Sequence, residues 1–133
     1  DANGTTMTVQ GSIQATQLIQ TSARDLKTDF DELDETSVLN DLVSLPVMSW
    51  RYKSDGTSVR HFGPVAEDFT QTFGLGDGKH ISTIDAHGVT MAAIQGLHRI
   101  VQERDAEIES LTERITKLES LVESLGKRTP IKK

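Results

Sequence analysis

The feature that most constrains the fold is a seven-residue apolar repeat near the C-terminal end of the sequence, over residues 94–125. One column of this repeat holds Ile94, Val101, Ile108, Ile115 and Val122, and the other holds Leu97, Arg104, Leu111, Leu118 and Leu125. Such a repeat is typical of a coiled coil, in which helices bury a shared seam, and the helix would be about 48 Å long. The alternative is an amphipathic helix packed on its own domain, although such helices rarely keep a 3.5-residue period this long.

The flanking positions of the repeat bear on the number of strands. β-Branched residues in the first column and leucine in the second favour a parallel dimer. However, Ile100 and Leu121 widen the apolar stripe at the seventh position of the heptad. Arg114 and Glu119 stand where they would meet across chains of a parallel bundle, and the hexapeptide 114–119 resembles a trimer-specifying motif of short coiled coils. We therefore expect a homotrimer.

The bulk composition narrows the function classes. The chain has 133 residues and a net charge of −6, which disfavours nucleic acid or an anionic membrane as a partner. It has no cysteine, so it has no disulfide and no thiol nucleophile. No apolar run approaches the length of a membrane span. Large aromatic residues are few, so we expect oligomerisation to supply part of the buried surface.

The rest of the chain indicates an α+β fold with four parts. Residues 1–21 are expected to be the end of an upstream β-rich shaft, because Met7, Val9, Ile13 and Ala15 alternate with polar residues as in a β-strand. Residues 22–93 form the globular part, 94–125 the coiled coil, and 126–133 a disordered tail after a helix stop at Gly126. Within the globular part we expect helices over 22–33, 36–45 and 65–73, a hairpin over 47–62, a loop over 74–78, a strand over 80–85, and a long helix beginning near residue 89.

Ser22 and Lys27 are the candidate nucleophile and base. A lysine amine that has lost its proton can activate a serine hydroxyl. The competing interpretation is a helix cap, because Ser22 and Asp25 have the spacing of a capping box. The sequence predicts no cofactor and no metal site, since His80, His87 and Asp85 lack ligand-specific spacing. Trp50 and Tyr52 could stack a sugar, but core packing is the commoner role of hairpin aromatics.

Four patches in order resemble the C-terminal intramolecular chaperone domain of endosialidases and related phage tail fibres, which recurs in bacterial surface proteins and Myrf-type factors. The resemblance covers about residues 18–125. The patches are Ser22-Ala23-Arg24-Asp25-Leu26-Lys27, Leu45-Pro46-Val47 with Trp50, Phe62-Gly63-Pro64-Val65-Ala66-Glu67-Asp68, and Ile84-Asp85 through Ala92-Ala93-Ile94-Gln95-Gly96-Leu97.

The resemblance implies a trimeric module that templates the folding of a β-rich passenger lying upstream in the same chain. In many members the opening serine cuts the chain just before itself with help from the lysine, which would place the scissile bond at Thr21–Ser22. Here Ala23 replaces the usual Asp, and Asp25 stands where Arg is usual, so an acid beside Lys27 would weaken it as a base. These departures favour a slow or non-cleaving member, with Ser22 as a helix cap.

The sequence thus predicts a homotrimeric chaperone whose partners are its own copies and its upstream passenger, on a virion tail fibre or a bacterial cell surface. Assembly would rest on Ile108, Leu111, Ile115 and Leu118. Two alternatives stay open: an active self-cleaving serine peptidase, and a plain coiled-coil adaptor for another protein.

Overall fold

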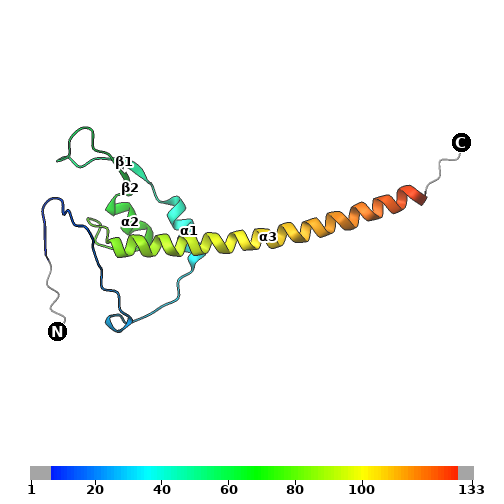
Figure 1. Cartoon of the computed structure of the whole chain (residues 1–133), viewed down its shortest axis with the longest axis horizontal. Coiled ribbons are helices and arrows are strands. Elements are labelled where there is room, and N and C mark those ends of the chain that lie inside the picture. The colour runs from blue at the N-terminus through cyan, green and yellow to red at the C-terminus, as the bar shows by residue number, and fades with distance from the viewer. Residues whose placement is uncertain (1–6, 129–133) are drawn as a thin grey trace. The chain divides into compact units, whose positions relative to one another are not determined.

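The computed structural model describes residues 7–128 and confirms the expected α+β class. The elements are a 3-10 turn η1 (Arg24–Leu26), α1 (Glu35–Ser44), β1 (Met48–Trp50), β2 (His61–Gly63), α2 (Ala66–Phe73) and α3 (Thr83–Arg128) (Figure 1). The chain divides into two compact units, one ending at Glu32 and the other beginning at Leu33. Each unit is described by itself below.

The described residues of the first unit contain no paired strand. Its described residues, from 7 onward, have extended or bent backbone without strand pairing, and η1 is its one helical turn. The described residues of this segment are therefore unpaired in the single chain, because a lone ribbon has no neighbour to accept its backbone hydrogen bonds, and the β-rich shaft to which they would belong stays a prediction. The helix expected over 22–33 is wrong beyond η1, since Lys27 returns to extended backbone and Asp29 takes a positive φ of 54°.

The second unit opens with α1, whose start is determined by Asp34. The Asp34 carboxylate accepts hydrogen bonds from the backbone N–H of Thr36 at 3.1 Å and of Ser37 at 3.2 Å. These bonds satisfy two amides that the first helical turn leaves without partners. Pro46 follows the end of the helix at Leu45, as expected of a residue that cannot continue a helix.

The β-hairpin forms where the alternating aromatics predicted it, but its paired part is shorter. β1 and β2 are antiparallel, with Trp50 opposite His61 and Met48 opposite Gly63. The Trp50 indole Nε1 donates to the Gly63 carbonyl oxygen at 3.2 Å, which ties the ring to the opposite strand. β2 ends at Gly63, opposite the start of β1, and Pro64 then leads into α2.

α2 carries the centre of the small core. Phe69 packs with Leu45 and Val89, and Val38, Leu42, Phe73 and Ile81 surround this cluster. Gly74 ends α2 in the left-handed region at φ 68°, a conformation that glycine adopts without a steric penalty. The loop expected over 74–78 is confirmed. The core joins residues from α1, α2 and α3, and it is the main apolar cluster of this unit.

α3 begins earlier and ends later than the sequence indicated. It runs from Thr83 to Arg128, 46 residues, or about 69 Å. The strand expected over 80–85 is wrong, because Ser82 acts as a helix start: its Oγ lies 3.4 Å from the Asp85 backbone nitrogen. The stop expected at Gly126 is also wrong, since the helix passes through it, and a single glycine costs only about 1 kcal/mol. Residues 129–133 of the predicted tail lie outside the described residues.

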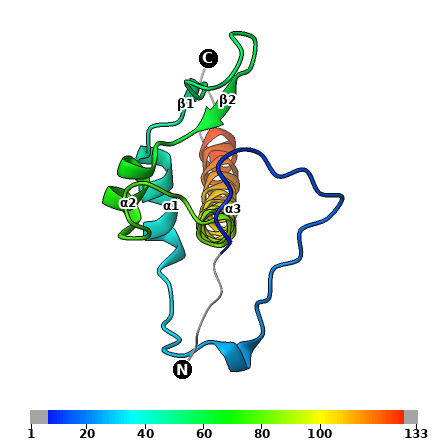
Figure 2. The same ribbon diagram turned by 90° about the vertical axis from the view of Figure 1, so that its left-hand side faces the viewer.

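The N-terminal part of α3 packs against α1 through small side chains. Val89, Ala92, Ala93 and Gly96 are its buried residues. A Cβ at Gly96 would lie 2.7 Å from the Glu35 carbonyl carbon, so the two helix backbones are in direct contact there. One turn further on, Arg99 donates to the Glu35 carboxylate at 2.8 Å. Figure 2, which looks along α3, shows α1 and α2 on one side of it.

Candidate functional site

The heptad seam of α3 is exposed along its whole length. Its apolar members keep between 44% and 68% of their surface open to solvent; they are Ile94, Leu97, Val101, Ile108, Leu111, Ile115, Leu118, Val122 and Leu125. Near residue 94, α1 covers the face of Val89, Ala92 and Gly96, whereas Ile94 and Leu97 point elsewhere around the helix. The alternative of a helix packed on its own domain therefore does not account for this seam.

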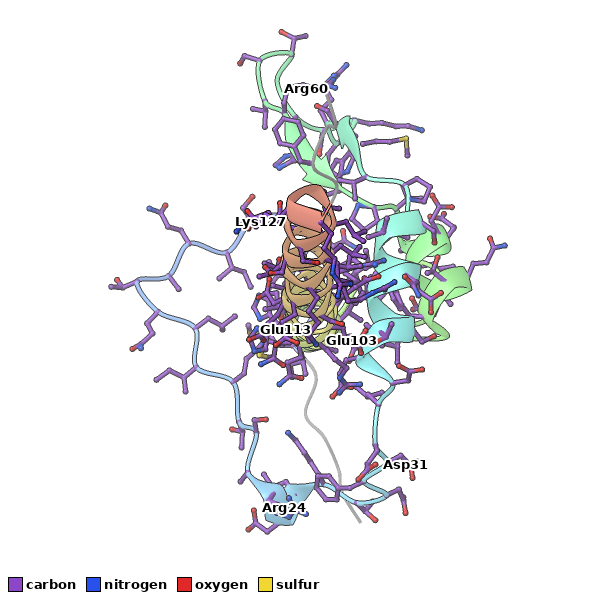
Figure 3. All side chains as sticks on the ribbon, turned by 90° about the vertical axis from the view of Figure 1, so that its right-hand side faces the viewer. Arg24, Asp31, Arg60, Glu103, Glu113 and Lys127 are labelled. Atoms are coloured by element: carbon purple, nitrogen blue, oxygen red, sulfur yellow. The ribbon has the colours of Figure 1, made fainter. Side chains whose placement is uncertain are left out.

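The exposure of the seam is clearest in the C-terminal half of α3. Every described residue from 101 to 128 is exposed. Figure 1 shows this stretch, yellow through orange to red, running beyond α1 and α2, and Figure 3 shows side chains such as Glu103 and Glu113 radiating from it. An isolated helix gains little stability from such a seam, because most helical stability in proteins comes from burying the apolar face. The seam is thus a candidate surface for assembly.

The exposed apolar stripe extends upstream of the predicted seam. Met91 is 61% exposed and Ile84 is 50% exposed, and both belong to α3. Ile84 was missed because the long helix was expected to begin near residue 89, and Met91 was left out of the seam because it falls in neither heptad column. The i to i+7 spacing of Ile84 and Met91 was the available signal.

The small size of the core supports the same conclusion. Side chains more than nine-tenths buried are few among the described residues: Leu45, Phe69, Val89, Ala92 and Ala93 are the buried apolar ones. A single chain therefore leaves much surface that association could remove from water.

The one charged residue in the two seam columns interacts within its own chain. Arg104, the polar member of the second column, donates from Nη1 to Glu107 Oε2 at 2.7 Å. Both side chains are more than half exposed. Arg114 and Glu119 are exposed as well, and their predicted pairing across chains stays a prediction.

Ser22 and Lys27 lie in direct contact in the first unit. Lys27 Nζ donates to Ser22 Oγ at 2.6 Å, across the η1 turn. The capping interpretation of Ser22 is wrong here, because Ala23 is the N-cap of η1 and no side chain caps that turn. A turn of three residues brings the two side chains together, since the chain reverses between them. Their catalytic role stays a prediction, and both residues are exposed.

The hairpin aromatics form a cluster rather than a flat platform. The Trp50 ring lies 5.0 Å from the Tyr52 ring, edge to face, and 5.0 Å from the His61 ring. His61 Nε2 lies 3.2 Å from Asp55 Oδ2. An open pocket of about 470 Å³ borders Trp50 and Tyr52, with Glu67, Lys79 and His80 on its rim. Because Tyr52 and His61 pack against Trp50, the arrangement serves hairpin packing.

The loop before α3 holds the one carboxyl whose titration is clearly shifted among the described residues. The His80 ring and the backbone N–H groups of Lys79 and His80 donate to Asp77, each at 2.9 Å. The hydrogen bond from His80, followed by those from the backbone, holds the pKa of Asp77 well below its usual range.

Residues 7–128 contain no group of three or more His, Asp and Glu side chains placed to hold a metal ion. Among the same residues, no helix has the length and apolar character needed to cross a membrane.

Comparison with known families tests the resemblance directly. Residues 22–74 match the family described as the chaperone of endosialidase. The match confirms the suspected family resemblance over this segment, which is less than half of the chain. It begins at Ser22, spans η1, α1, the hairpin and α2, and fits a chaperone role. The fourth patch, at the entry to the long helix, lies outside the matched range. No curated protein matches the chain.

Proposed function

We propose that this chain is a homotrimeric intramolecular chaperone whose α3 helices form a parallel coiled coil. The exposed seam of α3 carries the proposal. The match of residues 22–74 to the chaperone of endosialidase supports it, because that family acts on a domain lying upstream in the same chain and self-association is compatible with it.

Burial of the seam is the proposed driving force. Removing an apolar side chain of this size from water contributes about 1.5–3 kcal/mol when the side chain goes from fully exposed to fully buried. Each seam residue is about half exposed in the single chain, so each has much of that free energy to gain. Arg114 would cover the core with its stem and pair with Glu119 of a neighbouring chain, which favours three strands.

The chaperone effect follows from alignment. Once three chains are joined, their upstream segments meet at a high effective concentration instead of searching for partners in solution. Strand pairing in a β-rich passenger depends on register, and a slip of one residue moves every side chain to the opposite face. Three chains held in register would therefore suppress slipped pairings. The extended backbone of residues 7–21 is compatible with strands that form only between chains.

A matched pair of charge insertions tests the interface. Ile115→Asp places a carboxylate on the seam, whereas Ser120→Asp places one two residues past Leu118 on the outward face of the same helix. Light scattering should give a trimer for the original chain and for Ser120→Asp, and a loss of trimer for Ile115→Asp. Equal masses for the two variants would contradict a buried seam.

The chaperone claim needs the passenger itself. When the chain is produced with its upstream sequence, deletion of residues 94–125 should leave the passenger misfolded or aggregated. A passenger that still reached its native trimer without those residues would reduce the module to a tether. A partner other than a second copy on the seam would support the adaptor alternative.

Self-cleavage is the second candidate function, and the contact between Lys27 and Ser22 favours it. The amine of Lys27 would first have to be neutral, which removal of water during assembly would promote. Lys27 Nζ would then take the proton of Ser22 Oγ as that oxygen bonds to the Thr21 carbonyl carbon. The Thr21–Ser22 C–N bond breaks, Lys27 returns the proton to the departing amine, and water hydrolyses the resulting ester.

Intact mass of a chain produced with its upstream sequence separates cleavage from assembly. Cleavage should release a fragment beginning at Ser22, and Ser22→Ala should abolish it. Lys27→Arg keeps the positive charge but leaves a guanidinium that does not act as a base, so it should also prevent cleavage. The departures at Ala23 and Asp25 favour slow or absent cleavage; an uncut chain that still forms a trimer would leave the chaperone proposal intact.

A further inference from the structure

Arg104 interrupts an otherwise uniform apolar seam. The residues before it in the two columns are Ile94, Leu97 and Val101, and the residues after it begin with Ile108 and Leu111. A uniform seam has no unique alignment, because a slip of one heptad places apolar side chains against apolar side chains again. Arg104 is therefore the one residue of the seam columns that distinguishes one register from another.

The structure shows how Arg104 can be accommodated. Its guanidinium turns along the helix to the Glu107 carboxylate, at 2.7 Å from Nη1 to Oε2. Glu107 stands at the seventh position of the heptad, which borders the seam in a parallel coiled coil. The pair carries no net charge, and the guanidinium has further N–H donors free to reach other carboxylates.

We propose that Arg104, positioned by Glu107, fixes the register of the assembled chains. This inference rests on the proposed trimer. In register, three guanidinium groups and three carboxylates share one layer, and each donor has acceptors on its own chain and on its neighbours. After a slip of one heptad, each pair would lie against Leu97 or Leu111 of another chain. A charged pair in an apolar layer is strongly disfavoured, whereas a single polar layer is a known means of specifying alignment.

Spin-label distances in the full chain test this directly. The sequence has no cysteine, so Ser120→Cys on the outward face gives one labelling site per chain. The original chain should give a single label-to-label distance. With Arg104→Leu we expect a second population, because a slip of one heptad displaces labels by about 10.5 Å along the axis. Lys117→Gln, which removes a positive charge away from the seam, should keep the single distance.

Glu107→Gln separates the positioning of Arg104 from the register of the assembled chains. It removes the carboxylate that holds Arg104 but leaves the polar layer in place, so register should persist while the concentration needed for assembly rises at least tenfold. A single unchanged distance for Arg104→Leu would overturn the inference, since register would then be set elsewhere. A labelled original chain that is monomeric by light scattering would instead refute the proposed trimer itself.

Discussion

Gly96→Ala is the sharpest test of the packing between α1 and α3. The added methyl carbon would lie 2.7 Å from the Glu35 carbonyl carbon and 3.2 Å from the Thr36 backbone nitrogen. Both are backbone atoms at the start of α1, so no side-chain rotation can relieve the clash. The Glu35–Arg99 ion pair ties the same turn of α1 to α3 and further limits movement there.

The expected magnitude follows from two opposing effects. Overpacking of this kind typically costs about 1–3 kcal/mol. Replacing a helical glycine by alanine contributes about 1 kcal/mol in the opposite direction. We therefore expect a net loss of up to about 2 kcal/mol in the free energy of unfolding, and a fall in Tm of up to about 8 °C.

Gly88→Ala is the matched control for this substitution. Gly88 lies in the same helix, and a Cβ there would meet no atom within 4 Å. Only the helix-propensity gain should remain, so Gly88→Ala should raise Tm. Thermal unfolding followed by circular dichroism at one protein concentration compares the two variants. If Gly96→Ala stabilised the protein as much as Gly88→Ala, the close approach of α1 and α3 would be refuted.

Two further predictions concern hydrogen bonds. Asp34→Ala removes the side chain that accepts both hydrogen bonds at the start of α1, and it should lower the free energy of unfolding by about 1 kcal/mol. Asp34→Asn keeps a side-chain oxygen and should retain most of that stability. Chemical denaturation measures both variants, and equal losses would refute the cap. His80→Ala should raise the pKa of Asp77 toward its ordinary value, measured by NMR titration of the carboxyl. Because the pKa of Asp77 is depressed in the folded chain, its ionised carboxylate stabilises the fold above the ordinary aspartate pKa, and this stabilisation declines as the pH falls toward the folded pKa. An unchanged pKa of Asp77 in His80→Ala would contradict the role of the His80 hydrogen bond.

The parts of the fold that depend on local sequence could be predicted. Pro46 and the cluster at Asp34 gave the limits of α1 to within a residue or two, because caps and prolines act within one turn. The alternating aromatics around Trp50 likewise located the hairpin. The entry to α3 was misplaced because its apolar residues also suit a strand, and the weak cap at Ser82 was overlooked.

The parts that depend on distant contacts could not be predicted. Nothing in the local sequence of Gly96 indicates that the carbonyl of Glu35 lies against it. The strand pattern of residues 7–16 is readable, but a strand also needs a neighbouring strand, which one chain does not supply. At Ser22, the sequence spacing favoured a helix cap. The structure instead has a contact with Lys27, because η1 starts at Arg24 with Ala23 as its N-cap, one residue too late for Ser22 to cap it.

The molecular mass of the purified chain in solution tests the central claim most directly. Sedimentation equilibrium, measured over a range of concentrations, should give a species of three times the 14.6 kDa of one chain. Ile115→Asp should reduce this mass, and Ser120→Asp should leave it unchanged. A chain that remained monomeric or dimeric at every concentration would contradict the trimeric chaperone.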